Sequence, residues 1–245
     1  MQSKSNLSKE ENKLIVVRNA YFKMIYVEGG TFLMGATPEQ EEDAYIDEVP
    51  VHRVSLDSFY IGETVVTQHI WQIVMGNNPS NHKGDYFPVT NVGWDDCQEF
   101  IQKLNAMQDI QFRLPTEAEW EYSARGGVYH SLYKYAGGDN IDDVAWHKGN
   151  SGNKPHMVKC KKPNALGLYD MNGNVWEWCQ DFSEEYTPED QINPVVLRPC
   201  EHDSYRVYRG GSFTSNAKSS CRVSSRDDAL PCPRLDLGFR LAFQI

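Results

Sequence analysis

The side chains best suited to chemistry lie in one segment, from Arg206 to Ala242. It contains, in order, R-V-Y-R-G-G-S-F, the small-residue stretch T-S-N-A-K-S-S, Cys221-Arg222, Arg226, Pro231 and L-G-F-R-L-A. Guanidinium groups can bind carboxylates or backbone carbonyls with two parallel hydrogen bonds. A run of small polar residues between such groups is typical of a solvated surface turn on a rigid support.

The cysteines form no recognisable metal or disulfide pattern. They include no C-x-x-C pair and lack the density of a disulfide scaffold. Buried cysteine behaves as a small apolar residue, so we predict mostly buried free thiols. The six are Cys97, Cys160, Cys179, Cys200, Cys221 and Cys232.

Composition predicts a soluble globular protein. The 245 residues are 40% hydrophobic and 12% aromatic, with a formal net charge of −10, which disfavours nucleic acid and anionic membranes as partners. No stretch approaches the roughly 20 apolar residues of a spanning helix, so we expect no membrane insertion. The N-terminus shows no signal peptide. As given, the chain is expected to be cytoplasmic, or secreted or surface-displayed if its original N-terminus has been trimmed.

The first half predicts strands followed by helices. After a polar lead of residues 1–20, residues 24–34 are expected to form two short strands around Gly29-Gly30, and residues 51–61 a half-buried strand. The acidic stretch of residues 39–48 between them predicts a solvated loop.

Three helices are expected next. Thr67 can cap a helix with Ile70 and Trp71 on its apolar face, and a second helix follows Asp95-Asp96. Thr116 and Glu119 form a capping box for a third helix, which Gly126 ends. From residue 127 onward we predict short strands joined by long ordered loops, so the fold class is α+β.

Five blocks in this order resemble the formylglycine-generating enzyme, or sulfatase-modifying factor, family. The resemblance implies a single domain over residues 21–245 with a C-type-lectin-like fold, little regular secondary structure and bound calcium. In that frame Arg222, Arg226 and Arg240 are predicted to hold the loops, so that substituting them unfolds the domain before it changes specificity. The blocks are G-G-T-F-L-M-G at 29–35, P-V-T-N-V-G-W-D-D at 88–96, residues 113–127, G-L-Y-D-M-N-G-N-V-W-E-W at 167–178, and residues 206–242.

Enzymes of that family oxidise a cysteine of a C-x-P-x-R-type motif to formylglycine, using O2 and Cu(I) held by two thiolates. The matching positions here fall on Ser215 and on residues 218–220, which contain no cysteine. A serine hydroxyl is a hard ligand and lacks the redox-active sulfur. Cys221 lies close by, but one thiolate is half a site, and we predict no copper site. The histidine ligand set of the related iron-dependent sulfoxide synthases is also missing.

The family's calcium ligands correspond to Asp170, Gly173, Val175 and Glu177. Two carboxylates and two backbone carbonyls are hard oxygen ligands of the kind that calcium takes. The resemblance therefore predicts a structural calcium ion, not a catalytic one. The alternative is that Asp170 and Glu177 only satisfy backbone amides or pair with arginines.

The C-terminal segment also resembles the variable region of proteins diversified by retroelements, many of which share this fold. Several of its residue types can be reached from asparagine codons by changing adenines. Tyr186, Tyr205 and Tyr208 could add contact area or belong to the core. Under this interpretation the predicted ligand contacts are Thr214, Ser215, Asn216, Lys218, Ser224, Asp227, Asp228, Leu230, Arg234 and Asp236.

The sequence thus favours a non-catalytic protein that binds a protein or glycan ligand through its C-terminal loops. Two alternatives stay open: a copper-dependent sulfatase-modifying oxidase with an unrecognised thiol pair, and a fixed structural or regulatory subunit of a larger assembly.

Overall fold

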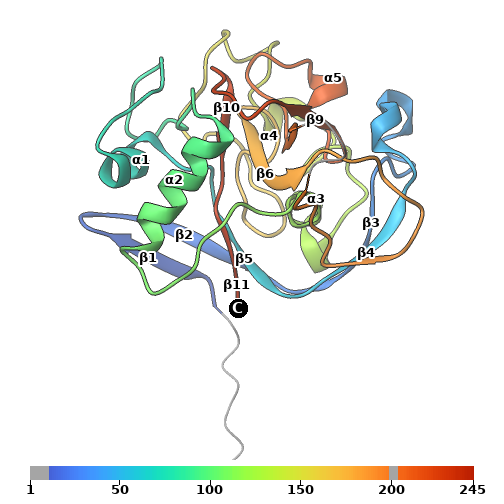
Figure 1. The fold of residues 1–245 in the computed structure, drawn as a ribbon. Coiled ribbons are helices and arrows are strands. Elements are labelled where there is room, and N and C mark those ends of the chain that lie inside the picture. Colours follow the sequence, from blue (N-terminus) through green and yellow to red (C-terminus); the bar gives the residue numbers. More distant parts are fainter. Residues whose placement is uncertain (1–10, 199–203) are drawn as a thin grey trace, which may run out of the picture.

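The computed structural model describes residues 11–198 and 204–245, and Cys200 lies outside them. Within these residues the strands form three small sheets, linked by long loops and covered by short helices (Figure 1). Two apolar clusters fill the interior, one under the first two helices and one around the third.

The first sheet joins the two ends of the described chain. Its strand order is β1 (Lys13–Val17), β2 (Ala20–Val27), β5 (Phe59–Gly62) and β11 (Ala242–Gln244), all antiparallel. β1 lies inside the stretch that we predict as a polar lead. It forms a strand because Ile15 and Val17 are buried against the core.

The second sheet contains β3 (Gly30–Met34), β4 (His52–Leu56) and β7 (Gln191–Ile192). The two strands expected around Gly29-Gly30 are confirmed as β2 and β3. The single strand expected over residues 51–61 is wrong, because the chain leaves this sheet after β4 and enters the first sheet as β5. A Cβ on Gly29 would lie 2.5 Å from the Leu56 carbonyl oxygen, so only glycine fits beside this crossing.

The third sheet carries the C-terminal loops. Its order is β10 (Leu237–Phe239), β6 (Trp176–Phe182), β8 (Arg206–Arg209) and β9 (Arg226–Ala229). β10 runs parallel to β6, whereas β8 is antiparallel to both β6 and β9. β9 is the edge strand, and its two central residues are exposed.

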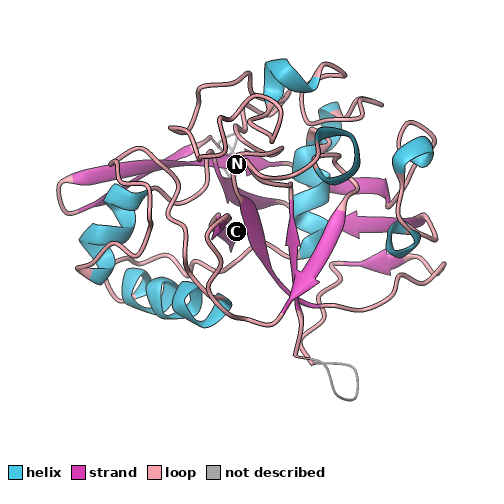
Figure 2. Cartoon of the chain, turned by 90° about the horizontal axis from the view of Figure 1, so that it is seen from above, coloured by secondary structure: helices cyan, strands magenta, loops and turns pink. Residues whose placement is uncertain are grey.

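The first two predicted helices are confirmed as α1 (Gln68–Met75) and α2 (Trp94–Asn105), which lie side by side (Figures 1 and 2). They pack through Trp71 and Phe100, whose rings stack at 5.3 Å. The amide of Gly93 donates to Asp96 Oδ2 at 2.7 Å at the start of α2.

The third predicted helix is confirmed as α3 (Glu117–Ala124). Its capping box is present, with the Glu119 amide donating to Thr116 Oγ1 and the Thr116 amide donating to Glu119 Oε2. Gly126 follows in the left-handed region at φ +100°. The shorter helical pieces are η3 (Gly127–Tyr129), α4 (Ile141–Val144) and α5 (Ala217–Ser220).

The acidic stretch of residues 39–48 contains two 3-10 turns, η1 (Glu41–Asp43) and η2 (Ile46–Glu48). The prediction of a solvated loop is wrong for Gln40 and for Glu48, which are both completely buried. Glu48 is buried against Arg222.

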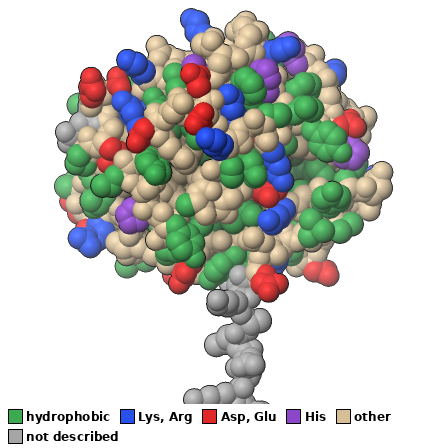
Figure 3. All heavy atoms as spheres, turned by 180° about the vertical axis from the view of Figure 1, so that it is seen from behind, with side chains coloured by type: hydrophobic (Ala, Val, Ile, Leu, Met, Phe, Trp, Pro, Cys, Tyr) green, Lys and Arg blue, Asp and Glu red, His purple; other side chains and the backbone are tan. Residues whose placement is uncertain are grey.

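None of the helices in the described residues is long and apolar enough to span a bilayer. On the face opposite to that of Figure 1, acidic and basic side chains alternate with apolar ones (Figure 3).

Candidate ligand-binding face

The C-terminal loops stand on buried pairs of arginine and glutamate. Arg222 donates from Nη1 to Glu48 Oε2 at 2.7 Å and from Nη2 to Glu48 Oε1. Ser224 Oγ donates to the same Oε2 at 2.6 Å. Burial raises the pKa of Glu48, but these hydrogen bonds outweigh burial and leave that pKa below its ordinary value. The ionised carboxylate therefore ties residues 222–224 to the N-terminal half.

A second buried carboxylate, that of Glu117, binds two further arginines. Arg226 donates to it from Nε and Nη2 at 2.8 and 2.9 Å, and Arg209 from Nη1 at 3.3 Å. Burial raises the pKa of Glu117, but the two guanidiniums outweigh burial and lower it. Tyr186 donates its hydroxyl to Glu117 Oε1 at 3.1 Å, and the Arg226 guanidinium lies 4.3 Å from its ring. Tyr186 is therefore part of this buried support.

The third pair joins β6 to the residue that follows β10. Arg240 donates from Nε and Nη2 to Glu177 at 2.7 Å each, and Trp120 donates from Nε1 to Glu177 Oε2 at 2.7 Å. The scaffold role predicted for the three arginines is confirmed by these pairs. We call the buried arginines and their carboxylates the ion-pair frame: Arg209, Arg222, Arg226, Arg240, Glu48, Glu117, Glu121 and Glu177.

The predicted calcium ligands differ in how well they fit. Glu177 does not fit as a carboxylate ligand, because Arg240 and Trp120 occupy both of its oxygens. Asp170 fits better, because its donors are the neutral Lys159 amide at 2.9 Å and, more distantly, Asn174 at 3.4 Å. Burial raises the pKa of Asp170 to about 6. Among the described residues, no three His, Cys, Asp or Glu side chains gather where they could hold a metal ion. A calcium ion here would depend on Asp170 together with the carbonyls of Gly173 and Val175.

The positions that match the oxidase thiols carry hydroxyls. Ser215 Oγ accepts from the Ser212 amide at 2.9 Å, which closes a tight turn. Cys221 is buried beneath this turn, and burial raises its pKa to about 12. Cys179 is also buried, whereas Cys160 and Cys232 are exposed. A thiol with a raised pKa is a poor source of the thiolate that Cu(I) needs.

The ten predicted ligand contacts separate into exposed and buried residues. Ser224 is fully buried in the ion-pair frame, so it cannot touch a ligand as we predict. The other nine are exposed or half-exposed, and they lie on the loops around α5, β9 and β10 at the top of Figure 1. We call these nine residues the C-terminal face: Thr214, Ser215, Asn216, Lys218, Asp227, Asp228, Leu230, Arg234 and Asp236.

Asp236 links two loops of the C-terminal face. Its Oδ2 accepts from Ser212 Oγ at 2.8 Å and from Thr214 Oγ1 at 3.0 Å, and its Oδ1 lies 3.8 Å from Arg234 Nε. Arg234 also donates from Nη1 to the Tyr208 hydroxyl at 2.8 Å. The loops at residues 212–214 and 234–236 are therefore held together by side-chain hydrogen bonds before any ligand arrives.

The remaining two tyrosines differ in exposure. Tyr208 is only 2% exposed, and the edges of Trp176 and Trp178 pack against it in T-shaped contacts. Tyr205 is 36% exposed and is the most exposed of the three tyrosines, since Tyr186 is half-buried. Leu230 and Leu235 are 50% and 56% exposed, so the loops also present apolar surface.

Comparison with known proteins decides the family. Residues 13–245 match the family described as the sulfatase-modifying factor enzyme 1-like domain. The chain belongs to this family. The formylglycine-generating enzyme of Streptomyces coelicolor is 31% identical, over 87% of this chain and 87% of that enzyme. The protein named Chaperone protein LppX of Paenibacillus barcinonensis is also 31% identical, over 80% of each.

Among solved structures, Treponema denticola variable protein 1 is similar to this member of the sulfatase-modifying factor family. The TM-score is 0.87 and the identity 32%, over 97% of this chain and 100% of that one. The predicted fold class is thereby confirmed: an α+β, C-type-lectin-like domain of the formylglycine-generating type with little regular secondary structure. The resemblance to variable proteins of this fold is confirmed as well.

Proposed function

We propose that the chain is a non-catalytic member of the family that binds a protein or glycan ligand through the C-terminal face. The observation that carries the proposal is the separation of this face from the ion-pair frame beneath it. The side-chain hydrogen bonds of the face residues reach Ser183, Ser212 and Tyr208 but, within the described residues, none of the charged groups of the ion-pair frame. Arg222 and Ser224, close by in sequence, are fully buried. Side chains on the face can therefore change without loss of the fold.

Chemical variety on the face supports a role in recognition. Asp227 and Asp228 on the edge strand β9, Lys218 on α5 and Leu230 in the next loop offer charge of both signs and apolar area within one surface. The similarity to a solved variable protein supports diversification of this segment. So do its residue types, most of which can be reached from asparagine codons by changing adenines.

Sequencing this locus across a natural population tests the proposal. We expect substitutions to concentrate in adenine-containing codons of the C-terminal face, while the codons of Arg222, Ser224 and Arg226 stay constant. A uniform, low substitution rate across residues 206–240 would contradict diversification and favour a fixed partner.

A separate assay tests whether oxidase activity is absent. This assay is needed because the chain is related to a formylglycine-generating enzyme. The protein is loaded with Cu(I) and incubated with O2 and a peptide that contains C-x-P-x-R. We expect no formylglycine by mass spectrometry. Turnover of this peptide would overturn the non-catalytic assignment and lead to a search for thiolate ligands, starting with Cys221.

A further inference from the structure

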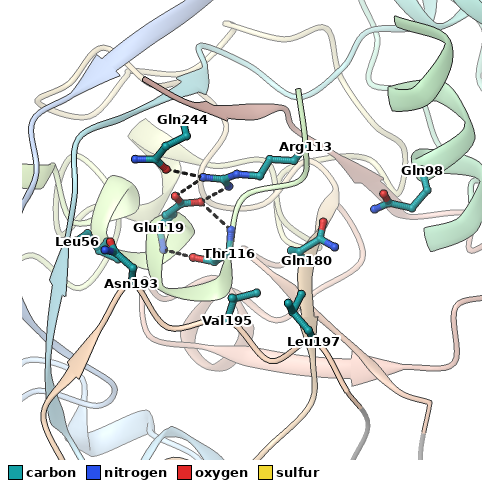
Figure 4. A pocket seen from close by; sticks show the side chains of 10 residues that line it. All are labelled: Leu56, Gln98, Arg113, Thr116, Glu119, Gln180, Asn193, Val195, Leu197 and Gln244. Carbon is teal, nitrogen blue, oxygen red and sulfur yellow. Dashed lines mark hydrogen bonds and ion pairs between the residues drawn. The ribbon is translucent and has the colours of Figure 1, made fainter. Parts of the chain in front are cut away.

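A second concave site lies away from the C-terminal face. A cavity of about 420 Å³ opens between α2, the start of α3, β6 and β11 (Figure 4). This volume is within the range of small-ligand pockets, roughly 300–1,000 Å³. No residue of the C-terminal face lines it, so it can act independently of the proposed function.

One wall of the cavity is aliphatic. Leu56, Val195 and Leu197 line it, and Leu197 is 63% exposed although it is a large apolar side chain. Covering an exposed leucine at the mouth of a cavity with an apolar ligand group is favourable, because it removes apolar surface from water. Among the described residues no aromatic side chain lines the cavity, so these residues offer no ring on which a flat ligand could stack.

The opposite wall carries charges that neutralise each other. Arg113 donates from Nη1 and Nη2 to the two oxygens of Glu119, both at 2.6 Å, and from Nη2 to Gln244 Oε1 at 3.1 Å. Glu119 also accepts from the Thr116 amide at 2.9 Å. Figure 4 shows this group meeting at the cavity rim. A bidentate pair leaves no net charge for an ionic ligand, so the cavity favours a neutral one.

Two carboxamides in the cavity lack protein partners. Gln98 Nε2 is buried and has no hydrogen-bond acceptor. The side chain of Gln180 is only half-buried, and it forms no hydrogen bond within the part of the chain that the structure describes. A buried donor without an acceptor is costly and rare in folded proteins, so it indicates a missing partner. Each carboxamide offers a donor and an acceptor, which matches the donor and acceptor of a peptide group.

The carboxamide of Gln180 stands on a rigid backbone. The backbone amide of Gln180 donates to the Pro115 carbonyl at 2.9 Å, and its backbone carbonyl accepts from Arg206 Nη1 at 2.8 Å. The Arg206 guanidinium lies between two rings, 3.7 Å from the centre of Trp94 and 3.3 Å from that of Phe182. This wall is therefore formed before a ligand binds, which reduces the entropy lost on binding.

We propose that this cavity binds a short neutral peptide segment. An aliphatic side chain of the segment packs against Leu56, Val195 and Leu197, and its main-chain amide pairs with Gln98 and Gln180. The inference names a second site, and it stands whether or not the C-terminal face binds a ligand.

Titration with N-acetyl-leucinamide, followed by NMR of the glutamine side-chain NH2 groups, tests the proposal. We expect saturable shifts of the Gln98 and Gln180 signals and contacts between the leucine methyl groups of the probe and those of Val195 and Leu197. Methyl α-glucopyranoside and acetate should leave these signals in place, because a sugar and an anion match the cavity less well.

Gln98→Leu should raise the Kd of the probe about tenfold, because it removes the unpartnered donor. The matched control is Gln102→Leu, an exposed glutamine on the same helix, which should bind as the wild type does. The proposal is overturned if the wild type shows no saturable shift, if sugar or acetate shifts the same signals equally, or if both variants bind alike.

Discussion

The two halves of the domain are held together by different forces. Under α1 and α2 the contacts are apolar: Trp71 stacks on Phe100, and Phe239 meets the same Phe100 ring edge-on at 5.3 Å. Beneath the C-terminal loops the contacts are buried ion pairs such as Arg222–Glu48, with both side chains fully buried. Apolar packing adapts to changes that conserve volume, whereas a buried charge needs its own partner. We therefore call the part under α1 and α2, which tolerates substitutions that conserve volume, the tolerant half. We call the part beneath the C-terminal loops, where each buried charge needs its partner, the demanding half.

Removing one partner of a buried pair should give the largest effect. Arg222→Ala leaves the Glu48 carboxylate buried without its cation, and we expect a loss of about 3–5 kcal/mol in the free energy of unfolding. Ile101→Val in the apolar half should cost only about 0.5–1.5 kcal/mol. Urea denaturation at neutral pH measures both.

A double variant shows whether the loss comes from the unpaired charge. Arg222→Met combined with Glu48→Leu should recover much of the stability, since no buried charge remains. If Arg222→Ala costs no more than Ile101→Val, the distinction between the halves is wrong.

Bound calcium should have the next largest effect on stability. If Asp170 contributes to a calcium site, adding calcium at a hundredfold excess over its Kd raises the free energy of unfolding by about 2–3 kcal/mol. Chelation with EDTA should then lower the Tm of the wild type but leave Asp170→Asn unchanged. Equal melting of the wild type with calcium and with EDTA would favour the alternative, in which Asp170 and Glu177 serve only protein donors.

The pH dependence separates carboxyls of opposite behaviour. Burial, followed by repulsion from Glu117, raises the pKa of Asp181 to about 7. Between about pH 4 and pH 7 the folded state then holds a proton that the unfolded state releases, so stability falls as pH rises through this window. The lowered pKa values of Glu48 and Glu117 act the other way: their contribution is present above the ordinary pKa of 4.5 and is lost on acidification.

Between pH 5 and 7 the free energy of unfolding of the wild type should fall as pH rises, because of Asp181. In Asp181→Asn we expect this fall to be smaller by about 1 kcal/mol per pH unit. The asparagine also loses an acceptor for the Glu117 or Val196 amide, which lowers stability at every pH. For this reason the slopes against pH are compared, and not the stabilities themselves. Unfolding in urea at several pH values measures it. Identical slopes for variant and wild type would mean that Asp181 is already ionised in the folded protein.

Substitutions on the C-terminal face should have the smallest effect on stability. Lys218→Ala and Leu230→Ala shorten exposed side chains, so each should change the free energy of unfolding by less than about 0.5 kcal/mol. Ser224→Ala is the matched buried control, and it should cost about 1–3 kcal/mol because Glu48 loses a donor. Comparable losses for exposed and buried positions would mean that the face is part of the support.

Local signals predict the helices of both halves well. The spacing of Ile70 and Trp71 and the Thr116–Glu119 capping box specify α1 and α3 within a few residues, because both signals act along one helix. The break between β4 and β5 escapes prediction, since an alternating pattern continues through Asp57-Ser58 while the chain changes sheet.

The demanding half is harder to predict because its partners are far apart in the sequence. Arg222 and Glu48 are separated by 174 positions, and nothing near Glu48 distinguishes it from its acidic neighbours. Ser224 looks like its small polar neighbours for the same reason, although it faces inward. The cavity with Gln98 and Gln180 joins α2 to β6, and no motif marks either glutamine.

The pairing of β11 with β5 sets the order in which the protein can be completed during synthesis. Phe243 stacks on Tyr60 at 4.6 Å, and Gln244 donates to the Ser58 carbonyl across 186 positions. The first sheet thus lacks its last strand until residues 242–244 have left the ribosome. A frameshift or stop codon in the segment of residues 206–240 therefore removes β11 along with the loops, and β5 is left without its partner strand on that side.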